Sequence, residues 1–133
     1  MPKRTAIAPG AIAARFGKEE LSYGELNARA NKLARYLRGL GVGPEVLVGI
    51  FTDRSLEMLV GLIAILKAGG AYLPLDPEYP PERIGFMIDD SQARVVLTQS
   101  ALLHRLPDTA TLTICLDTDS ATFADESSEN LHA

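Results

Sequence analysis

Few side chains in this sequence have the types and spacing that catalysis or metal binding requires. The chain holds two histidines, His104 and His132, and one cysteine, Cys115. A zinc site needs such ligands in closely spaced groups, and a Ser-His-Asp triad needs a motif that places the histidine beside a nucleophile. We interpret His104 as a surface residue, His132 as part of a tail and Cys115 as a thiol within an apolar strand. The sequence therefore predicts no catalytic residue and no metal-binding residue.

Three other groups could suggest a ligand site. Asp53-Arg54 lies at a strand-to-helix junction, where open α/β sheets bind ligands, but we favour helix capping as its role. Asp89-Asp90 with Glu82 is interpreted as the solvated face of a helix. The glycine-rich run 39–43 closes a helical segment and precedes a strand, whereas a phosphate loop follows a strand and opens a helix. We therefore expect no cofactor-binding residue in this chain.

The composition indicates one domain with an apolar core. The chain has 133 residues, 47% of them hydrophobic, and a net charge of -4. This mild acidity, with no Trp present, argues against nucleic acid and anionic membranes as partners. A single cysteine fits a reducing compartment. The longest apolar run, 58–66, contains Gly61 and is far shorter than the roughly 20 residues that span a bilayer. We expect a cytoplasmic protein.

The first half of the chain predicts a hairpin and a helix. Residues 11–16 and 20–22 flank a short turn, which indicates a small hairpin. Ser22 and Glu25 have the spacing of a capping box, in which each side chain accepts a hydrogen bond from the other residue's backbone. Apolar residues then recur at spacings of three and four over about 17 residues, which predicts a half-buried helix. Its apolar face is predicted to hold Leu26, Ala30, Leu33, Ala34, Leu37 and Leu40. Its polar face is predicted to hold Asn27, Asn31, Lys32, Arg35 and Arg38.

The second half predicts alternating strands and helices. Residues 46–51 are apolar without alternation, which indicates a strand covered on both faces. Asp53 or Ser55 can cap the next helix, which is apolar nearly all round from Leu56 to Leu66 and is expected to be largely buried. Gly69 or Gly70 is expected to adopt the left-handed conformation that ends it. The remaining expected elements are strands at 71–75, 94–98 and 111–116, a helix from Pro81 to about Ser91, and a weak helix at 100–105.

This alternation predicts an α/β fold with a partial parallel sheet and flanking helices. We expect residues 1–10 to form a disordered leader, 11–116 the folded body and 117–133 an acidic, loosely ordered tail. A partial sheet would expose an unpaired edge and apolar faces. We therefore expect poor solubility or self-association.

Two segments carry a family resemblance. Residues 21–26, Leu-Ser-Tyr-Gly-Glu-Leu, resemble the first core motif of the adenylation domains of nonribosomal peptide synthetases. Residues 66–80, Leu-Lys-Ala-Gly-Gly-Ala-Tyr-Leu-Pro-Leu-Asp-Pro-Glu-Tyr-Pro, resemble the second. The segments 41–44 and 54–58 between them are also typical of that family. The resemblance extends from about Ala11 to at least Leu116.

The resemblance implies the amino-terminal part of an acyl-adenylate-forming (AMP-binding) enzyme fold. The full-length family forms aminoacyl-adenylates from ATP with Mg²⁺ and passes the acyl group to a phosphopantetheine carrier domain. Its phosphate loop, amino-acid pocket and catalytic lysine lie beyond the second motif, so Lys67 is not that lysine. The resemblance thus implies a structural portion of the domain that is inactive alone, binds no cofactor itself and pairs with the remainder of an adenylation domain. The amino acid that the domain activates stays undetermined.

Two alternatives belong to other classes. The chain could be a non-enzymatic interaction module that pairs its sheet edge and helices with a separate chain carrying the rest of the domain. A small flavodoxin-like nucleotide binder is the other alternative. It would need a phosphate loop, and the sequence contains no Gly-x-x-x-x-Gly-Lys-[Ser/Thr] motif.

Overall fold

A computed structural model of the chain describes residues 10–107 and 111–129. Its centre is a four-stranded parallel sheet with the strand order β4-β3-β5-β6. The strands are β3 (Leu47–Phe51), β4 (Ala71–Pro74), β5 (Val95–Thr98) and β6 (Leu112–Cys115). A separate antiparallel hairpin consists of β1 (Ile12–Phe16) and β2 (Glu19–Ser22). The α/β fold with a parallel sheet and a small hairpin is confirmed.

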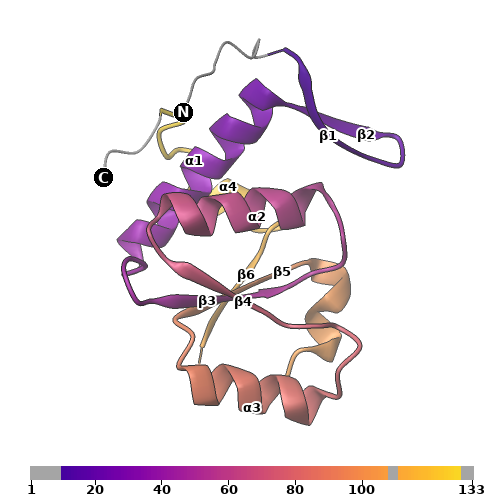
Figure 1. The fold of residues 1–133 in the computed structure, drawn as a ribbon, viewed down its shortest axis with the longest axis vertical. Coiled ribbons are helices and arrows are strands. Elements are labelled where there is room, and N and C mark those ends of the chain that lie inside the picture. Colours follow the sequence, from indigo (N-terminus) through magenta and orange to yellow (C-terminus); the bar gives the residue numbers. More distant parts are fainter. Residues whose placement is uncertain (1–9, 108–110, 130–133) are drawn as a thin grey trace.

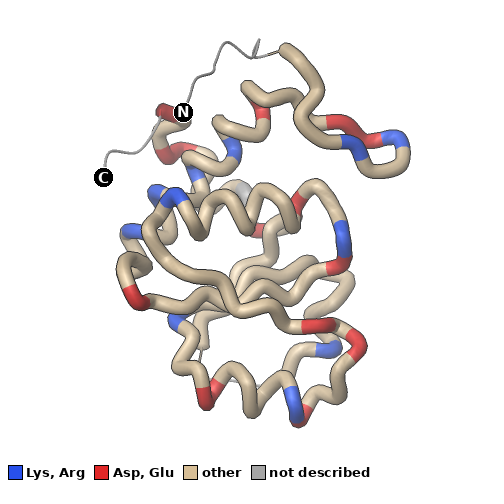
Figure 2. Tube along the Cα trace, viewed as in Figure 1, with Lys and Arg blue, Asp and Glu red and all other residues tan. Residues whose placement is uncertain are grey.

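Helices cover both faces of this sheet (Figure 1). One face carries α1 (Tyr23–Gly39), α2 (Leu56–Lys67) and the short α4 (Ser120–Phe123). The other carries α3 (Pro81–Ser91) and the 3-10 helix η1 (Ser100–Arg105). Figure 2 shows that charged residues lie on the hairpin, the helices and the loops, and the four strands of the parallel sheet contain none. No helix in the described ranges has the length and apolar character needed to cross a membrane.

The two sheet faces build two apolar clusters, because successive side chains of a strand point to opposite faces. Val48, Ile50 and Leu97 pack with α1 and α2. Phe51 and Val96 pack with α3 and η1. This confirms the expectation that the segment 46–51 forms a strand covered on both faces.

Helix α1 begins as its sequence predicts. The Ser22 hydroxyl accepts a hydrogen bond from the Glu25 N–H at 3.1 Å, and the Glu25 carboxylate accepts one from the Ser22 N–H at 3.0 Å. The predicted apolar face is buried from Leu26 to Leu37, and Leu40 is half-buried. Asn31, which the periodicity places on the polar face, is buried as well. Its side-chain amide donates to the Ser128 carbonyl at 2.8 Å, because the C-terminal segment covers this side of the helix.

Helix α2 is less buried than its sequence predicts. Its inner residues reach the core, but Leu66 is 59% exposed and Met58, Leu59 and Leu62 are half-buried. The helix lies at the surface of the helical layer, so only part of its apolar circumference meets the sheet and α1. Gly69 (φ +91°) adopts the left-handed conformation that ends the helix.

Each edge of the sheet has one position that hinders pairing with a further strand. Just after β6, the Leu116 N–H donates a hydrogen bond to the Thr98 carbonyl of β5. Because successive residues of a strand alternate in direction, the backbone N–H and carbonyl of Cys115 point away from the sheet. Asp119 occupies both of these groups: its carboxylate accepts from the Cys115 N–H and its own N–H donates to the Cys115 carbonyl, each at 2.8 Å. On β4, Pro74 stands at an outward position and has no N–H to offer.

The C-terminal segment contributes to the core. Phe123 is 9% exposed and joins the cluster beneath α1, with its ring 5.8 Å from that of Tyr36. The Arg35 guanidinium donates to the Glu129 carbonyl at 3.0 Å. The described part of the expected loose tail, 117–129, thus packs on α1, because its one aromatic side chain finds an apolar site there. The boundaries 11–116 and 117–133 stay predictions, and residues 1–9 of the expected leader lie outside the described ranges.

Candidate functional site

The strand order defines the position where an open α/β sheet offers a ligand site. The chain runs from β3 outward to β4 on one side, and from β5 outward to β6 on the other. The carboxyl ends of β3 and β5 therefore form a topological switch point, the usual place for a ligand crevice. Asp53, which the sequence marks as a junction residue, lies just beyond β3 at this point.

A glutamine fills this crevice. The Gln99 side-chain oxygen accepts from the Asp53 N–H at 3.0 Å, and its amide nitrogen donates to the Glu57 carboxylate at 3.1 Å. Ser55, rather than the alternative Asp53, caps α2, since its hydroxyl accepts from the Met58 N–H at 3.1 Å. Sequence reasoning missed Gln99; its position directly after a buried strand is the signal that could have identified it.

Polar groups at the neighbouring strand ends are also joined to one another. The Asp117 carboxylate, beyond β6, accepts from the Ser100 hydroxyl at 2.7 Å and from the Ser100 N–H at 3.0 Å. It also accepts from the Thr118 N–H at 3.0 Å. These hydrogen bonds, that of the Ser100 hydroxyl first, lower the pKa of the Asp117 carboxyl. Asp117 therefore holds η1 to the end of β6 as an ionised acceptor.

The amino terminus of α2 does not suit the phosphates of ATP. Phosphate binding needs free N–H groups at a helix start, usually presented by a glycine-rich loop. Here the Asp53 and Met58 N–H groups already donate to protein atoms, and the connection 52–55 contains no glycine. The carboxylates of Asp53 and Glu57 would also repel an anion. This junction is consequently built as scaffold.

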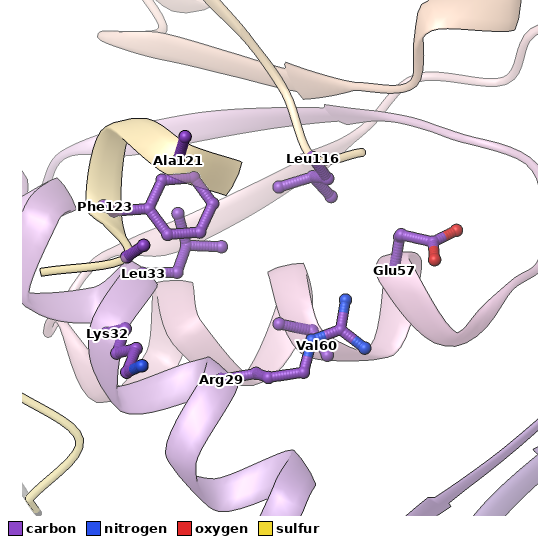
Figure 3. A pocket seen from close by; sticks show the side chains of 9 residues that line it. Arg29, Lys32, Leu33, Glu57, Val60, Leu116, Ala121 and Phe123 are labelled. Atoms are coloured by element: carbon purple, nitrogen blue, oxygen red, sulfur yellow. The ribbon is translucent and has the colours of Figure 1, made fainter. Parts of the chain in front are cut away.

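An apolar cavity of 260 Å³ lies between α1, α2 and the residues that follow β6. In Figure 3 the side chains of Leu33, Val60, Leu116 and Phe123 form its walls, with charged side chains at its rim. The rim residues are Arg29, Lys32 and Glu57. The lining includes no nucleophile beside a base, so the cavity can accept an apolar group but carries no visible catalytic chemistry.

The other singled-out side chains have structural surroundings. The Lys67 ammonium donates to the Asn27 side-chain oxygen at 3.0 Å, and desolvation lowers its pKa. Burial raises the pKa of the Cys115 thiol, which keeps it protonated and poorly nucleophilic. His104 is exposed on η1, and His132 lies outside the described residues. Within the described ranges, no group of three or more His, Cys, Asp or Glu side chains is placed to hold a metal ion.

Comparison with known proteins identifies close relatives. The family model for AMP-binding enzymes matches residues 2–133. A linear gramicidin synthase of Brevibacillus parabrevis is 58% identical over 123 residues, which cover 92% of this chain and 2% of that protein. Zwittermicin A synthase ZmaJ of Bacillus cereus is 55% identical over 100 residues, 75% of this chain and 19% of that protein. The chain thus spans only a small part of the curated relatives it matches.

Solved structures share the fold. The nonribosomal peptide synthetase FmoA3 in its AMPPNP-bound form superposes with a TM-score of 0.86 at 35% identity, over 93% of this chain and 13% of that one. The N-terminal subdomain of Klebsiella oxytoca NpsA gives a TM-score of 0.72 at 21% identity, over 92% of this chain and 30% of that one, which is a likeness of fold alone. The hairpin, sheet and helices described above therefore occur within a much larger synthetase.

Proposed function

The chain belongs to the family of AMP-binding enzymes, and we propose that it is the amino-terminal structural portion of an amino-acid-activating adenylation domain. The observation that carries this proposal is the superposition on the FmoA3 synthetase, with a TM-score of 0.86 over 93% of this chain. The chain corresponds to part of the adenylation domain of nonribosomal peptide synthetases. The complete domain would form an aminoacyl-adenylate from ATP in the cytoplasm.

In this proposal the chain supplies scaffold and the remainder supplies chemistry. The full-length family uses ATP and Mg²⁺. Gln99 and Asp117, at the carboxyl ends of β5 and β6, are hydrogen-bonded within the chain, and the start of α2 is unsuited to phosphate. The buried Thr52 hydroxyl, just after β3, has no partner among the described residues. The triphosphate, the metal and the amino acid would therefore be bound by segments outside this chain, and a carrier domain would receive the product. The interaction-module alternative is not favoured, because the chain matches part of the adenylation domain within longer synthetases.

A chimeric enzyme tests the proposal. This chain would replace its matched segment in ZmaJ, and ATP–pyrophosphate exchange would be measured over a panel of amino acids. We expect the chimera to retain exchange with the same preferred amino acid as ZmaJ, because the chain contributes framework and not pocket. The isolated chain is the matched control and should give no exchange. Exchange by the isolated chain, or an inactive but folded chimera, would contradict the proposal.

A further inference from the structure

Helix α2 carries an apolar stripe that the described part of the chain covers only in part. The stripe consists of Met58, Leu59, Leu62 and Leu66, which recur at the spacings of one helix face. Leu66 is 59% exposed and the other three are half-buried. A helix that is apolar nearly all round is normally buried on all sides. The exposed side of α2 therefore indicates a contact with a further element.

The stripe continues into a groove. Phe16 of the hairpin, 37% exposed, joins Met58, Leu59 and Leu62 around a hollow of 200 Å³. Arg54 lies at one end of this groove, and Lys67 ends the helix at the other. The only charged residues of α2 are Glu57 and Lys67, at its two ends. This surface suits a long apolar helix face or segment whose flanks carry carboxylates.

Each sheet edge is interrupted at one position. The outward N–H and carbonyl of Cys115 are occupied by Asp119, and Pro74 removes a donor from the opposite edge. Strand addition needs a row of free donors and acceptors. These interruptions favour the helical faces as the surface on which a larger body packs.

We infer that the α2 stripe and its groove are the surface on which the remainder of an adenylation domain packs. This inference rests on the proposed function. The occupant is suggested by the comparisons: the same fold occupies 13% of the FmoA3 chain and this chain matches 19% of ZmaJ, so in those proteins the fold belongs to a much longer polypeptide. A second copy of this chain is less suited, because two stripes would bring the cations Arg54 and Lys67 into the same interface.

Cysteine labelling in the ZmaJ chimera tests the surface. Leu66→Cys is the probe, and Asp90→Cys, at an exposed charged position of α3, is the matched control. Maleimide incorporation would be followed by peptide mass spectrometry in the isolated chain and in the chimera. We expect Leu66→Cys to react at least about tenfold more slowly in the chimera, as a desolvated interface residue should. The control should keep its rate.

The outcomes separate the two proposals. Equal labelling of Leu66→Cys in the isolated chain and in an active chimera would overturn the surface and leave the proposed function intact. A folded chimera without exchange activity would overturn both. A third outcome is that Leu66→Cys becomes protected in the isolated chain as the concentration rises but is not protected in the chimera. This result would mean that a second copy is the occupant, and it would also overturn the inference. Because Leu66 is exposed, its replacement should not unfold the chain; a melting temperature matching the wild type would verify this.

Discussion

At the scale of single residues, the polar side chains near the switch point act as ties between elements. Gln99 joins the β3–α2 connection to the end of β5, and Asp117 joins η1 to the end of β6. Their donors and acceptors are used within the protein, which is the normal condition of structural polar groups. A catalytic pair would instead leave an atom directed at a substrate position.

The Asp117 carboxyl should titrate below its ordinary value of 3.8. The Ser100 hydroxyl and N–H stabilise the ionised form in the folded chain, so this contribution to stability is present above the ordinary pKa and is lost as the pH falls through the lower, folded value. An NMR titration of the carboxyl carbon measures this midpoint. In Ser100→Ala the midpoint should rise towards 3.8, because the largest cause of the shift is removed. An unchanged midpoint in this variant would contradict the assignment.

At the scale of elements, each edge of the short parallel sheet carries one feature that hinders strand pairing. The Asp119 carboxylate takes the outward N–H of Cys115, and the Asp119 N–H takes its carbonyl. Natural sheets commonly use such devices against edge-to-edge association. The self-association that the sequence predicts stays a prediction.

Removal of the β6 cap should promote association. In Asp119→Ala the Cys115 N–H loses its acceptor and becomes available to a strand of another copy. We expect its average mass, measured by light scattering, to rise with concentration beyond that of the wild type. Asp119→Asn keeps a side-chain oxygen acceptor and should behave like the wild type. If both variants kept the wild-type mass, the cap would not be what protects this edge.

At the scale of the whole molecule, the C-terminal segment joins α1, α4 and β6 into one body. Phe123 lies in the main apolar cluster, and backbone carbonyls of Ser128 and Glu129 accept hydrogen bonds from α1. If this segment were a loose tail, substitutions in it would leave the free energy of unfolding unchanged. In a packed segment they would not.

Phe123→Ala should therefore destabilise the whole chain. Truncation of a buried phenylalanine leaves a cavity and typically costs about 3 kcal/mol or more. Phe123 is at the cluster's margin, so we expect the free energy of unfolding, from urea denaturation, to fall by about 3 kcal/mol. Asp125→Ala, at an exposed position of the same segment, should change it by less than about 0.5 kcal/mol. Equal stabilities for the two variants would mean that the segment is not packed in solution.

The sequence by itself determined the elements whose signals are local. The Ser22–Glu25 capping box marks the start of α1, and the unbroken apolar run before residue 52 marks a strand buried on both faces. Capping and side-chain periodicity involve residues a few positions apart, so they can be recognised without a fold. The two core motifs likewise indicated the family.

Only the tertiary structure decided which side chains meet across the chain. Asn31 is buried because a segment near residue 128 returns to α1, and Gln99 fills the switch point because the chain crosses from β4 over β3 to β5. Leu66 stays exposed because α2 lies at the surface of its layer. Such contacts join residues far apart in sequence, and their identity depends on how the elements pack rather than on any local pattern.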